Sequence, residues 1–496
     1  MHESKGSAVK TPANHRPRPS RRGFLISAAA FGASALLPFE KALAVKRADA
    51  YIFVLLCDAL RADRLGCYGY QRQIKGVRQS ITPTMDRMAS QGVLYEHCVA
   101  QASWTQTSMA SLLTSTWPVI KGNEHTFDYV PEGAQPLKSA TPGMYRFGLH
   151  TNPYMKEPIF SDQFDEFKYL PHSAGTNVPE EYAPALEMNR EFDWIAGPMV
   201  RDGKALFGYI HYMDPHEPYT YRHEFRGAFA PPGWKYMHPI LINKRLLPYR
   251  DDTGRVTADA PDEVTRRIEG MADAYDEDVA YLDKSLKRVF DLLKDYRIAD
   301  RTTVILAADH GQSFGEHGWW GHKVTLYEPE LHVPLIIAGP DIPKGVRVKS
   351  QVRNVDILPT IAAILGGDPK GFAGSPLLPA DRVEGQGNRF AYSCCDYTIY
   401  GDVNRLLTCL VTPKRQKYIR VLTTDHKLLR EELYDLAADP DEKKDLAPAS
   451  QDLIADLSKR LTAFESSVFW RTTSGGAPKI DKATEEALKA LGYVNH

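Results

Sequence analysis

The stretch Tyr51-Ile-Phe-Val-Leu-Leu-Cys57, followed at once by Asp58, is the clearest indication of the fold class. It is apolar without the alternation of a half-exposed strand, which is typical of a strand buried on both faces in a parallel sheet. Three similar runs follow, Leu206 to Met213, Thr303 to Ala308 and Val333 to Ala338. Because helical patterns lie between them, we predict an α/β domain with a mostly parallel sheet sandwiched by helices.

The pattern changes after about residue 385. The clearest helix before that point is expected from Asp276 to Arg297, with one apolar stripe. After it, short mixed runs from Arg405 to Val411 and from Lys417 to Leu422 indicate antiparallel strands, and an amphipathic helix is expected from about Ser450 to Phe469. We predict a main domain over residues 45–385 and a smaller C-terminal α+β subdomain with an antiparallel sheet over residues 386–496. Residues 219–262, rich in Pro, aromatic and basic side chains, are expected to form an insertion over the sheet edge.

Residues 1–44 are predicted to be a twin-arginine signal peptide. A basic head leads into Ser20-Arg-Arg-Gly-Phe-Leu25, then an apolar run to Phe39 and the small-residue segment Ala42-Leu-Ala44. The run is too short to span a bilayer comfortably. We expect passage through the twin-arginine export machinery and a periplasmic or secreted location. A basic disordered tail and an uncleaved membrane anchor are the alternatives.

Composition limits the function classes. The chain has 496 residues, 43% of them hydrophobic and 25% charged, with a formal net charge of -1. This is typical of a soluble globular protein without a basic surface, so we expect no nucleic-acid partner. The six cysteines match no zinc motif and are expected to be small buried residues. A bridge from Cys394 or Cys395 to Cys409 stays open.

Acidic and imidazole side chains follow three of the predicted strands. They are Asp58, the segment Asp214-Pro-His216, and the pair Asp309-His310. A lone Asp there is usually a helix cap, and a lone His is usually structural. However, ligands bind outside the carboxyl ends of parallel strands, so three such segments at equivalent positions favour a metal site.

A hydroxyl-rich segment from Ser103 to Thr114 reads as a loop that enters a helix. In isolation, N-capping by Thr105 or Ser108 explains it best. Helix N-termini also favour anions, however. A hydroxyl bound there to a divalent cation loses its proton more easily and can attack phosphorus or sulfur.

These residues give the chain a family resemblance. It resembles the sulfatase family of the alkaline phosphatase superfamily over nearly all of its mature length. The similar segments occur in order, at residues 58–69, 82–92, 104–114, 211–219, 309–318, 321–328 and 432–443. The resemblance implies an alkaline phosphatase-like fold, a catalytic role for residues 45–385 and a small-molecule anionic ester as substrate.

The departures from the family bear on the chemistry. Sulfatases convert Cys or Ser, within the motif Cys/Ser-x-Pro-x-Arg, to formylglycine; here the positions read Thr105-Gln-Thr-Ser-Met109, so no formylglycine is expected. The family's paired aspartates are reduced to Asp58 and Ala59, and His310 stands where many sulfatases have Asn. A threonine sulfate could not expel sulfate by elimination from its own carbon, whereas water can open a threonine phosphate beside a metal.

We therefore expect a metal-dependent hydrolase that cleaves a phosphate monoester, phosphate diester or phosphonate ester through Thr105. A sulfuric ester hydrolase and a non-catalytic relative that binds an anion are the alternatives. The resemblance implies one divalent cation, with Mn²⁺ or Zn²⁺ preferred over Ca²⁺ or Mg²⁺ because one ligand is an imidazole. Its expected ligands are Asp58, Thr105, Asp309 and His310.

The remaining site residues are expected around that cation. Lys323 would hold a non-bridging oxygen, and His216 or His322 would protonate the leaving oxygen, with His216 and Lys323 binding the substrate. A second metal bound by Asp214, His216 and His322 is the less favoured alternative. Two further residues are expected to face the pocket, Lys121 and Asn152. Three histidines are expected to be structural, His125, His211 and His317.

Overall fold

The computed structural model describes residues 50–118, 135–152, 155, 158–170, 182–219, 223–249, 256, 261–385, 389–399, 403–423 and 425–473. The predicted signal peptide, Lys121 and His125 lie outside the described residues. No helix in the described ranges combines the length and apolar character that crossing a bilayer requires.

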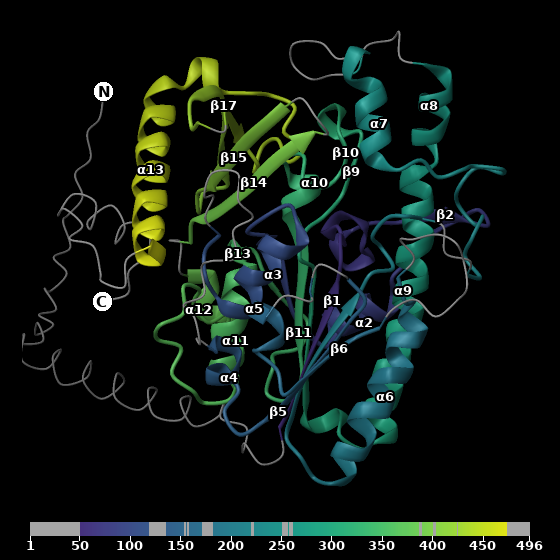
Figure 1. Cartoon of the computed structure of the whole chain (residues 1–496). Helices are drawn as coiled ribbons and strands as arrows, with labels where there is room; N and C mark the ends of the chain where they lie inside the picture. Colours follow the sequence, from purple (N-terminus) through teal and green to yellow (C-terminus); the bar gives the residue numbers. More distant parts are fainter. Residues whose placement is uncertain are drawn as a thin grey trace, which may run out of the picture.

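A nine-stranded sheet forms the centre of the molecule (Figure 1). Its strand order is β12-β4-β11-β8-β1-β7-β5-β6, and β13 pairs with β4. Strand β1 runs parallel to both of its neighbours, β7 and β8, and every residue of β1 is buried. The strands are β1 (Tyr51–Cys57), β4 (Gly92–Val99), β5 (Tyr145–His150), β6 (Glu166–Tyr169), β7 (Leu206–Tyr212), β8 (Thr302–Ala307), β11 (His332–Ala338), β12 (Val346–Val348) and β13 (Val352–Arg353).

The predicted α/β class is confirmed, with one difference in strand direction. Three of the four apolar runs form parallel strands, but Val333 to Ala338 forms β11, which pairs antiparallel with both β8 and β4. It is the one antiparallel strand among the described strands of this sheet. A run reads as continuously apolar because helices cover both faces of the sheet, and that burial does not depend on strand direction.

Helices cover both faces of the large sheet (Figure 1). On one face the long helix α9 packs against α2 and α6, and on the other α3 packs against α4, α5 and α11. The predicted helix from Asp276 is confirmed as α9, which begins five residues earlier, at Met271. The bounds are α2 (Pro83–Ser90), α3 (Thr105–Thr114), α4 (Pro136–Ala140), α5 (Pro158–Ser161), α6 (Ala185–Arg201), α9 (Met271–Asp295), α11 (Ile357–Ile364) and α12 (Ala380–Gly385).

The segment predicted as an insertion, residues 219–262, contains helix α7 (Pro239–Leu246), and α8 (Asp262–Glu269) begins at its last residue. Asn243 on α7 is buried, and its side-chain amide exchanges hydrogen bonds with the backbone of Trp320, at 2.7 and 3.2 Å. The insertion therefore supports the loop that carries His322 and Lys323. The short elements around it are β2 (Arg72–Ile74), β3 (Val77–Gln79), β9 (Ser313–Phe314), β10 (Trp320–Gly321) and α10 (Glu328–Leu331).

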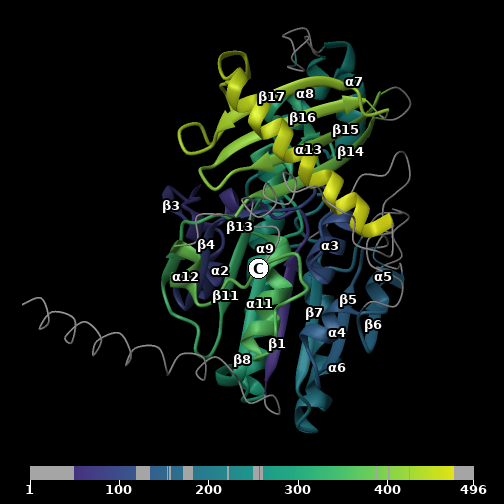
Figure 2. The ribbon, with the colours of Figure 1, turned by 90° about the vertical axis from the view of Figure 1, so that its left-hand side faces the viewer.

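A second, four-stranded antiparallel sheet follows, as predicted, in the order β14-β15-β16-β17. Helix α13 (Gln451–Thr473) crosses one face of it (Figure 2). The two sheets are joined where Ser393 Oγ donates to the Ala100 carbonyl, at 2.5 Å. The strands are β14 (Ala391–Ile399), β15 (Val403–Val411), β16 (Gln416–Thr423) and β17 (Leu428–Asp435).

All six cysteines are free thiols. Cys409 faces Ser393 across the β14–β15 pair, one residue away from Cys394 in register. The bridge that the sequence left open is therefore not formed. The boundary at residue 385 stays a prediction.

Candidate active site

The ends of two neighbouring strands bring two carboxylates together. Leu56 and Ala307 are paired in register, so Asp58 and Asp309 leave the same edge of the sheet, and both are fully buried. Asp309 Oδ1 accepts the backbone N–H groups of His310 at 2.9 Å and of Ala59 at 3.2 Å. Ala59 reaches this position with φ of 57°, a left-handed conformation that alanine rarely adopts. The local backbone is thus shaped around the Asp309 carboxylate.

Four donor atoms converge on one point, and we call their residues the metal group: Asp58, Thr105, Asp309 and His310. His310 Nε2 lies 3.2 Å from Thr105 Oγ1, 3.4 Å from Asp309 Oδ2 and 3.6 Å from Asp58 Oδ1. Ligands bound about 2.1 Å from one cation stand roughly 3.0 to 3.4 Å apart, which these distances approach.

The hydrogen bonds of the metal group also fit a cation. His310 Nδ1 donates to the Gly311 carbonyl at 2.8 Å, which leaves the Nε2 lone pair directed at the carboxylates. Asp58 Oδ1 and Asp309 Oδ2 are buried and have no hydrogen-bond partner in the described part of the chain. Two orphaned carboxylate oxygens that face a bare imidazole nitrogen and a hydroxyl form a donor set for a divalent cation.

The other oxygen of Asp58 is held in place. Asp58 Oδ2 accepts hydrogen bonds from His211 Nε2 at 2.8 Å and from Asn152 Nδ2 at 3.2 Å. The Tyr209 hydroxyl donates to His211 Nδ1 at 2.6 Å and sets the tautomer of that ring. Asn152 thus lies in the site, as predicted. His211, expected to be structural, also lines the site; its register position beside Leu56, next to the end of β1, was the signal that could have placed it there.

Charge in the metal group is unbalanced without a cation. Burial and the nearby Asp58 carboxylate raise the pKa of Asp309. Burial by itself would also raise the pKa of Asp58, but the imidazoles of His216, His211 and His310 lower it well below its usual value. Burial lowers the pKa of His310 and favours the neutral ring that a metal ligand needs. A bound cation would relieve the repulsion between the two carboxylates.

Thr105 is the first residue of α3, and only 2% of its surface is exposed. Ser108 Oγ donates to the Asp309 carbonyl at 2.5 Å, which ties the first turn of this helix to the end of β8. The positive end of the α3 helix dipole favours an anion at this position. The Thr105 hydroxyl therefore sits between the metal group and a place suited to an oxyanion.

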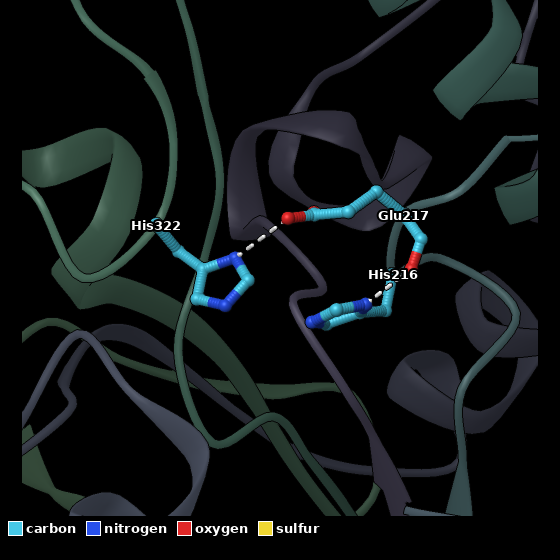
Figure 3. A group of neighbouring side chains, drawn as sticks. All are labelled: His216, Glu217 and His322. Atoms are coloured by element: carbon cyan, nitrogen blue, oxygen red, sulfur yellow. Dashed lines mark hydrogen bonds and ion pairs between the residues drawn. The ribbon is translucent and has the colours of Figure 1, made fainter. Parts of the chain in front are cut away.

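A second set of side chains adjoins the metal group, and Figure 3 draws three of its members, His216, Glu217 and His322. We call it the Glu217 group: His216, Glu217, Gln312 and His322. The rings of His310 and His322 stack with centroids 4.5 Å apart and planes at 22°, so the two groups are in contact. Asp214, which the sequence placed with these histidines, points elsewhere: its Oδ1 accepts the Ala185 N–H at 3.0 Å, at the start of α6. Asp214 therefore does not join the alternative second metal set, and Glu217 lies with His216 and His322 instead.

Lys323 lies beside the segment that leads into α3. Its backbone N–H donates to the Ser103 carbonyl at 2.8 Å, and its ammonium sits 3.5 Å from the centre of the Trp104 ring, one residue before Thr105. His317, by contrast, stacks on Tyr327 with centroids 3.7 Å apart and stays outside the site. Arg61, Glu217 and Gln312 were not singled out from the sequence. Arg61 donates to the Gln312 carbonyl at 2.8 Å and supports that loop from behind.

Comparisons with known proteins agree with this architecture. The model of the sulfatase family matches residues 50–367, and one described as N-sulphoglucosamine sulphohydrolase, C-terminal, matches residues 315–467. Iduronate 2-sulfatase of Mus musculus is 26% identical over 341 residues, which are 58% of this chain and 59% of that protein. Choline-sulfatase of Rhizobium meliloti is 28% identical over 173 residues, 32% of this chain and 31% of its own. The chain thus spans about three fifths or less of the length of these relatives.

Solved structures share the fold at low sequence identity. Phosphonate monoester hydrolase of Agrobacterium radiobacter is 18% identical with a TM-score of 0.59, covering 84% of this chain and 96% of its own. A 2-O GAG sulfatase is also 18% identical, with a TM-score of 0.63, and the match covers 87% of this chain and 95% of that protein. The matched family model, the ordered motifs and the fold together show that the chain belongs to the sulfatase family, with its alkaline phosphatase-like architecture.

Proposed function

We propose that this protein is a metal-dependent hydrolase that cleaves a phosphate ester or phosphonate ester with Thr105 as its nucleophile. One observation carries the proposal: Thr105 Oγ1 lies 3.2 Å from His310 Nε2 and faces the same point as the orphaned oxygens of Asp58 and Asp309. A helix-capping hydroxyl accepts a hydrogen bond from a backbone N–H of the first turn, whereas Thr105 Oγ1 contacts an imidazole and a carboxylate.

The metal group would hold one divalent cation, with Mn²⁺ or Zn²⁺ preferred because an imidazole is among the ligands. Such a cation supplies Lewis acidity, which makes an adjacent hydroxyl easier to deprotonate. The Thr105 hydroxyl donates a hydrogen bond to Asp58 Oδ2, with 3.5 Å between the two oxygens, so this carboxylate takes the proton that Thr105 loses. Thr105 Oγ1 then attacks phosphorus, forming an oxygen–phosphorus bond while the bond to the leaving oxygen breaks.

The other residues stabilise charge and supply the leaving-group proton. The Lys323 ammonium and the N-terminus of α3 offset the negative charge that builds on the non-bridging oxygens. His216 or His322 protonates the leaving oxygen. Water then attacks the threonine phosphate and gives its proton to the imidazole that protonated the leaving oxygen. The bond from phosphorus to Thr105 Oγ1 breaks, Thr105 Oγ1 regains the proton held by Asp58, and the acid is released. Both steps are substitutions at phosphorus.

Hydrolysis of a sulfate ester is the second candidate. The matched family and the names of its curated relatives favour it. Thr105 argues against it, because threonine cannot form the aldehyde hydrate from which sulfatases eliminate sulfate. The fold shared with a phosphonate monoester hydrolase is compatible with phosphorus as the reacting centre.

A substrate screen tests the proposal. Purified protein loaded with Mn²⁺ or Zn²⁺ is assayed on aryl esters of sulfate, phosphate, phosphate diester and phosphonate, beside Thr105→Ala as the control. We expect turnover of a phosphorus ester that Thr105→Ala lacks. Turnover of aryl sulfate alone would overturn the preference for phosphorus. Tight metal binding with no turnover would support a non-catalytic anion-binding protein instead.

We also propose export through the twin-arginine pathway to the periplasm or beyond. Support comes from Ser20-Arg-Arg-Gly-Phe-Leu25 and the apolar run after it. Changing Arg21 and Arg22 to Lys should leave the full-length protein in the cytoplasm, as fractionation would show. Unchanged export would contradict this proposal.

A further inference from the structure

Glu217 contacts both histidines of the Glu217 group, through two different chemical groups (Figure 3). Its main-chain carbonyl accepts a hydrogen bond from His216 Nδ1 at 2.5 Å. Its carboxylate Oε1 lies 3.5 Å from His322 Nδ1. The residue is 95% buried, since only 5% of its surface is exposed, so water competes little for these contacts. One residue thus links two imidazoles that come from loops far apart in the sequence.

We propose that Glu217 is a positioning residue that fixes the tautomer and direction of both imidazoles, so that each presents Nε2 to the leaving oxygen. The inference rests on the proposed function, because it concerns how the imidazoles supply a proton to the leaving oxygen during ester cleavage.

The tautomer of His216 is set by its hydrogen bond to the Glu217 carbonyl. A carbonyl oxygen only accepts hydrogen bonds, so the hydrogen of the neutral ring sits on Nδ1, which donates to Glu217. His216 Nε2 is then a bare nitrogen in the neutral ring and a second donor in the protonated ring. Burial by itself would lower the pKa of His216, but the charges of Glu217 and Asp58 raise it overall. The hydrogen bond to the Glu217 carbonyl therefore leaves Nε2 as the nitrogen that can carry the second proton.

The tautomer of His322 is set by Gln312, which contacts both Glu217 and His322. Burial would raise the pKa of Glu217, but the imidazoles of His322 and His216 lower it well below its usual value, so its carboxylate only accepts. Gln312 must then turn its amide nitrogen to Glu217 Oε2, at 2.8 Å, and its oxygen toward His322 Nδ1, at 3.0 Å. An accepting oxygen beside Nδ1 places the ring hydrogen there, as in His216.

The surroundings hold this arrangement next to the reaction centre. The His322 ring stacks on His310 and packs edge-on against His216, with centroids 4.5 and 4.8 Å away. Gln312 follows His310 by two residues, and Arg61 holds its carbonyl at 2.8 Å. The two imidazoles therefore cannot turn away without breaking contacts to Glu217, Gln312 and the metal group.

The test uses esters that differ only in their leaving group, within the class that the wild type hydrolyses. A para-nitrophenyl leaving group departs without a proton, whereas a phenyl or alkyl one needs it. In Glu217→Gln we expect kcat to fall less than about 3-fold for the para-nitrophenyl ester and about 100-fold for the phenyl ester, since a general acid contributes about 10² to 10⁴. KM and bound metal should not change. Gln312→Met, which removes the amide between Glu217 and His322, should give a smaller loss with the same dependence on the leaving group.

Glu432→Gln is the matched control. It removes another buried carboxylate, on β17 of the smaller sheet, which accepts hydrogen bonds from Tyr327 and Tyr434. This variant should lower kcat by the same factor for every ester or leave kcat unchanged. A loss in Glu217→Gln that is equal across the series, or no loss, would overturn the inference; if Glu217→Gln does not fold, Gln312→Met decides it by the same criterion. A fall in bound metal by one equivalent would overturn it too, because the group would then bind a second cation. An inactive wild type would contradict the proposed function itself, whereas an active wild type with an unchanged leaving-group series in Glu217→Gln contradicts this inference alone.

Discussion

The metal group and the Glu217 group lie in contact, yet they differ in how their polar atoms are satisfied. In the metal group, two buried carboxylate oxygens face each other's charge without a hydrogen-bond partner among the described residues. In the Glu217 group, both carboxylate oxygens and both Nδ1 atoms are paired, at 2.5 to 3.5 Å. A buried charge without a partner is costly. This difference supports the proposals that the first group binds a cation and that the second donates a proton.

The largest effect on activity is expected from substitution of Thr105, the proposed nucleophile. We expect Thr105→Ala to lower kcat by at least about 10³-fold for every leaving group, because no covalent step can then occur. The flat loss would contrast with the leaving-group-dependent loss in Glu217→Gln. Steady-state rates across the ester series measure both.

Thr105→Ser is the control, since it keeps a hydroxyl at the start of α3. We expect it to retain more than about a tenth of the activity, as a primary alcohol at the same place can also attack. Full activity in Thr105→Ala would show that water, and not Thr105, attacks the substrate.

The same contrast explains what the sequence could predict. Asp58, Asp309 and His310 follow buried strands, and a strand fixes the place of its last residue, so a pattern of apolar runs was enough to bring them together. His216, Glu217 and His322 lie on loops, whose course depends on tertiary contacts such as the one between Asn243 and Trp320. No local pattern indicates that Asp214 turns to α6 while Glu217 turns inward. The direction of β11 was missed for a related reason, because burial on both faces leaves no mark of strand direction.

Asp309→Asn tests whether the Asp309 charge destabilises the metal-free protein. Asn can still accept the N–H groups of Ala59 and His310, while its amide nitrogen replaces the orphaned Oδ2 and removes a buried charge. In metal-free protein at neutral pH we expect the variant to be about 1 to 3 kcal/mol more stable than wild type. With metal at about 1,000 times the wild-type Kd the order should reverse, since binding then adds about 4.1 kcal/mol to the stability of wild type and much less to that of the variant.

Thermal melts with chelator and with added Mn²⁺ or Zn²⁺ measure this reversal. Glu217→Gln is the comparison, because it lies in the group that needs no cation and should show no reversal. A variant less stable than wild type in chelator would mean that the Asp309 charge is balanced within the protein itself.

The smallest effect is expected at Asp214, which the sequence had grouped with His216 and His322. Burial raises the pKa of this carboxyl from 3.8 to about 7. Between about pH 3.8 and pH 7, Asp214 keeps a proton in the folded protein that it releases in the unfolded chain. The contribution of Asp214 to the free energy of unfolding therefore falls as pH rises and is constant above about pH 7. Asp214→Asn keeps an acceptor for the Ala185 N–H. Because the residue is partly exposed, we expect the variant to gain only about 1 kcal/mol over wild type above pH 7, and nothing near pH 4.

Denaturant unfolding at several pH values, with and without metal, measures this difference. Since Asp214 interacts with α6 rather than with a cation, the gain of Asp214→Asn should be the same in both conditions. If added metal abolished the gain, the charge at Asp214 would be compensated by a cation, and the Glu217 group would resemble the metal group after all. Parallel pH profiles for variant and wild type would instead show that Asp214 is ionised in the folded protein throughout.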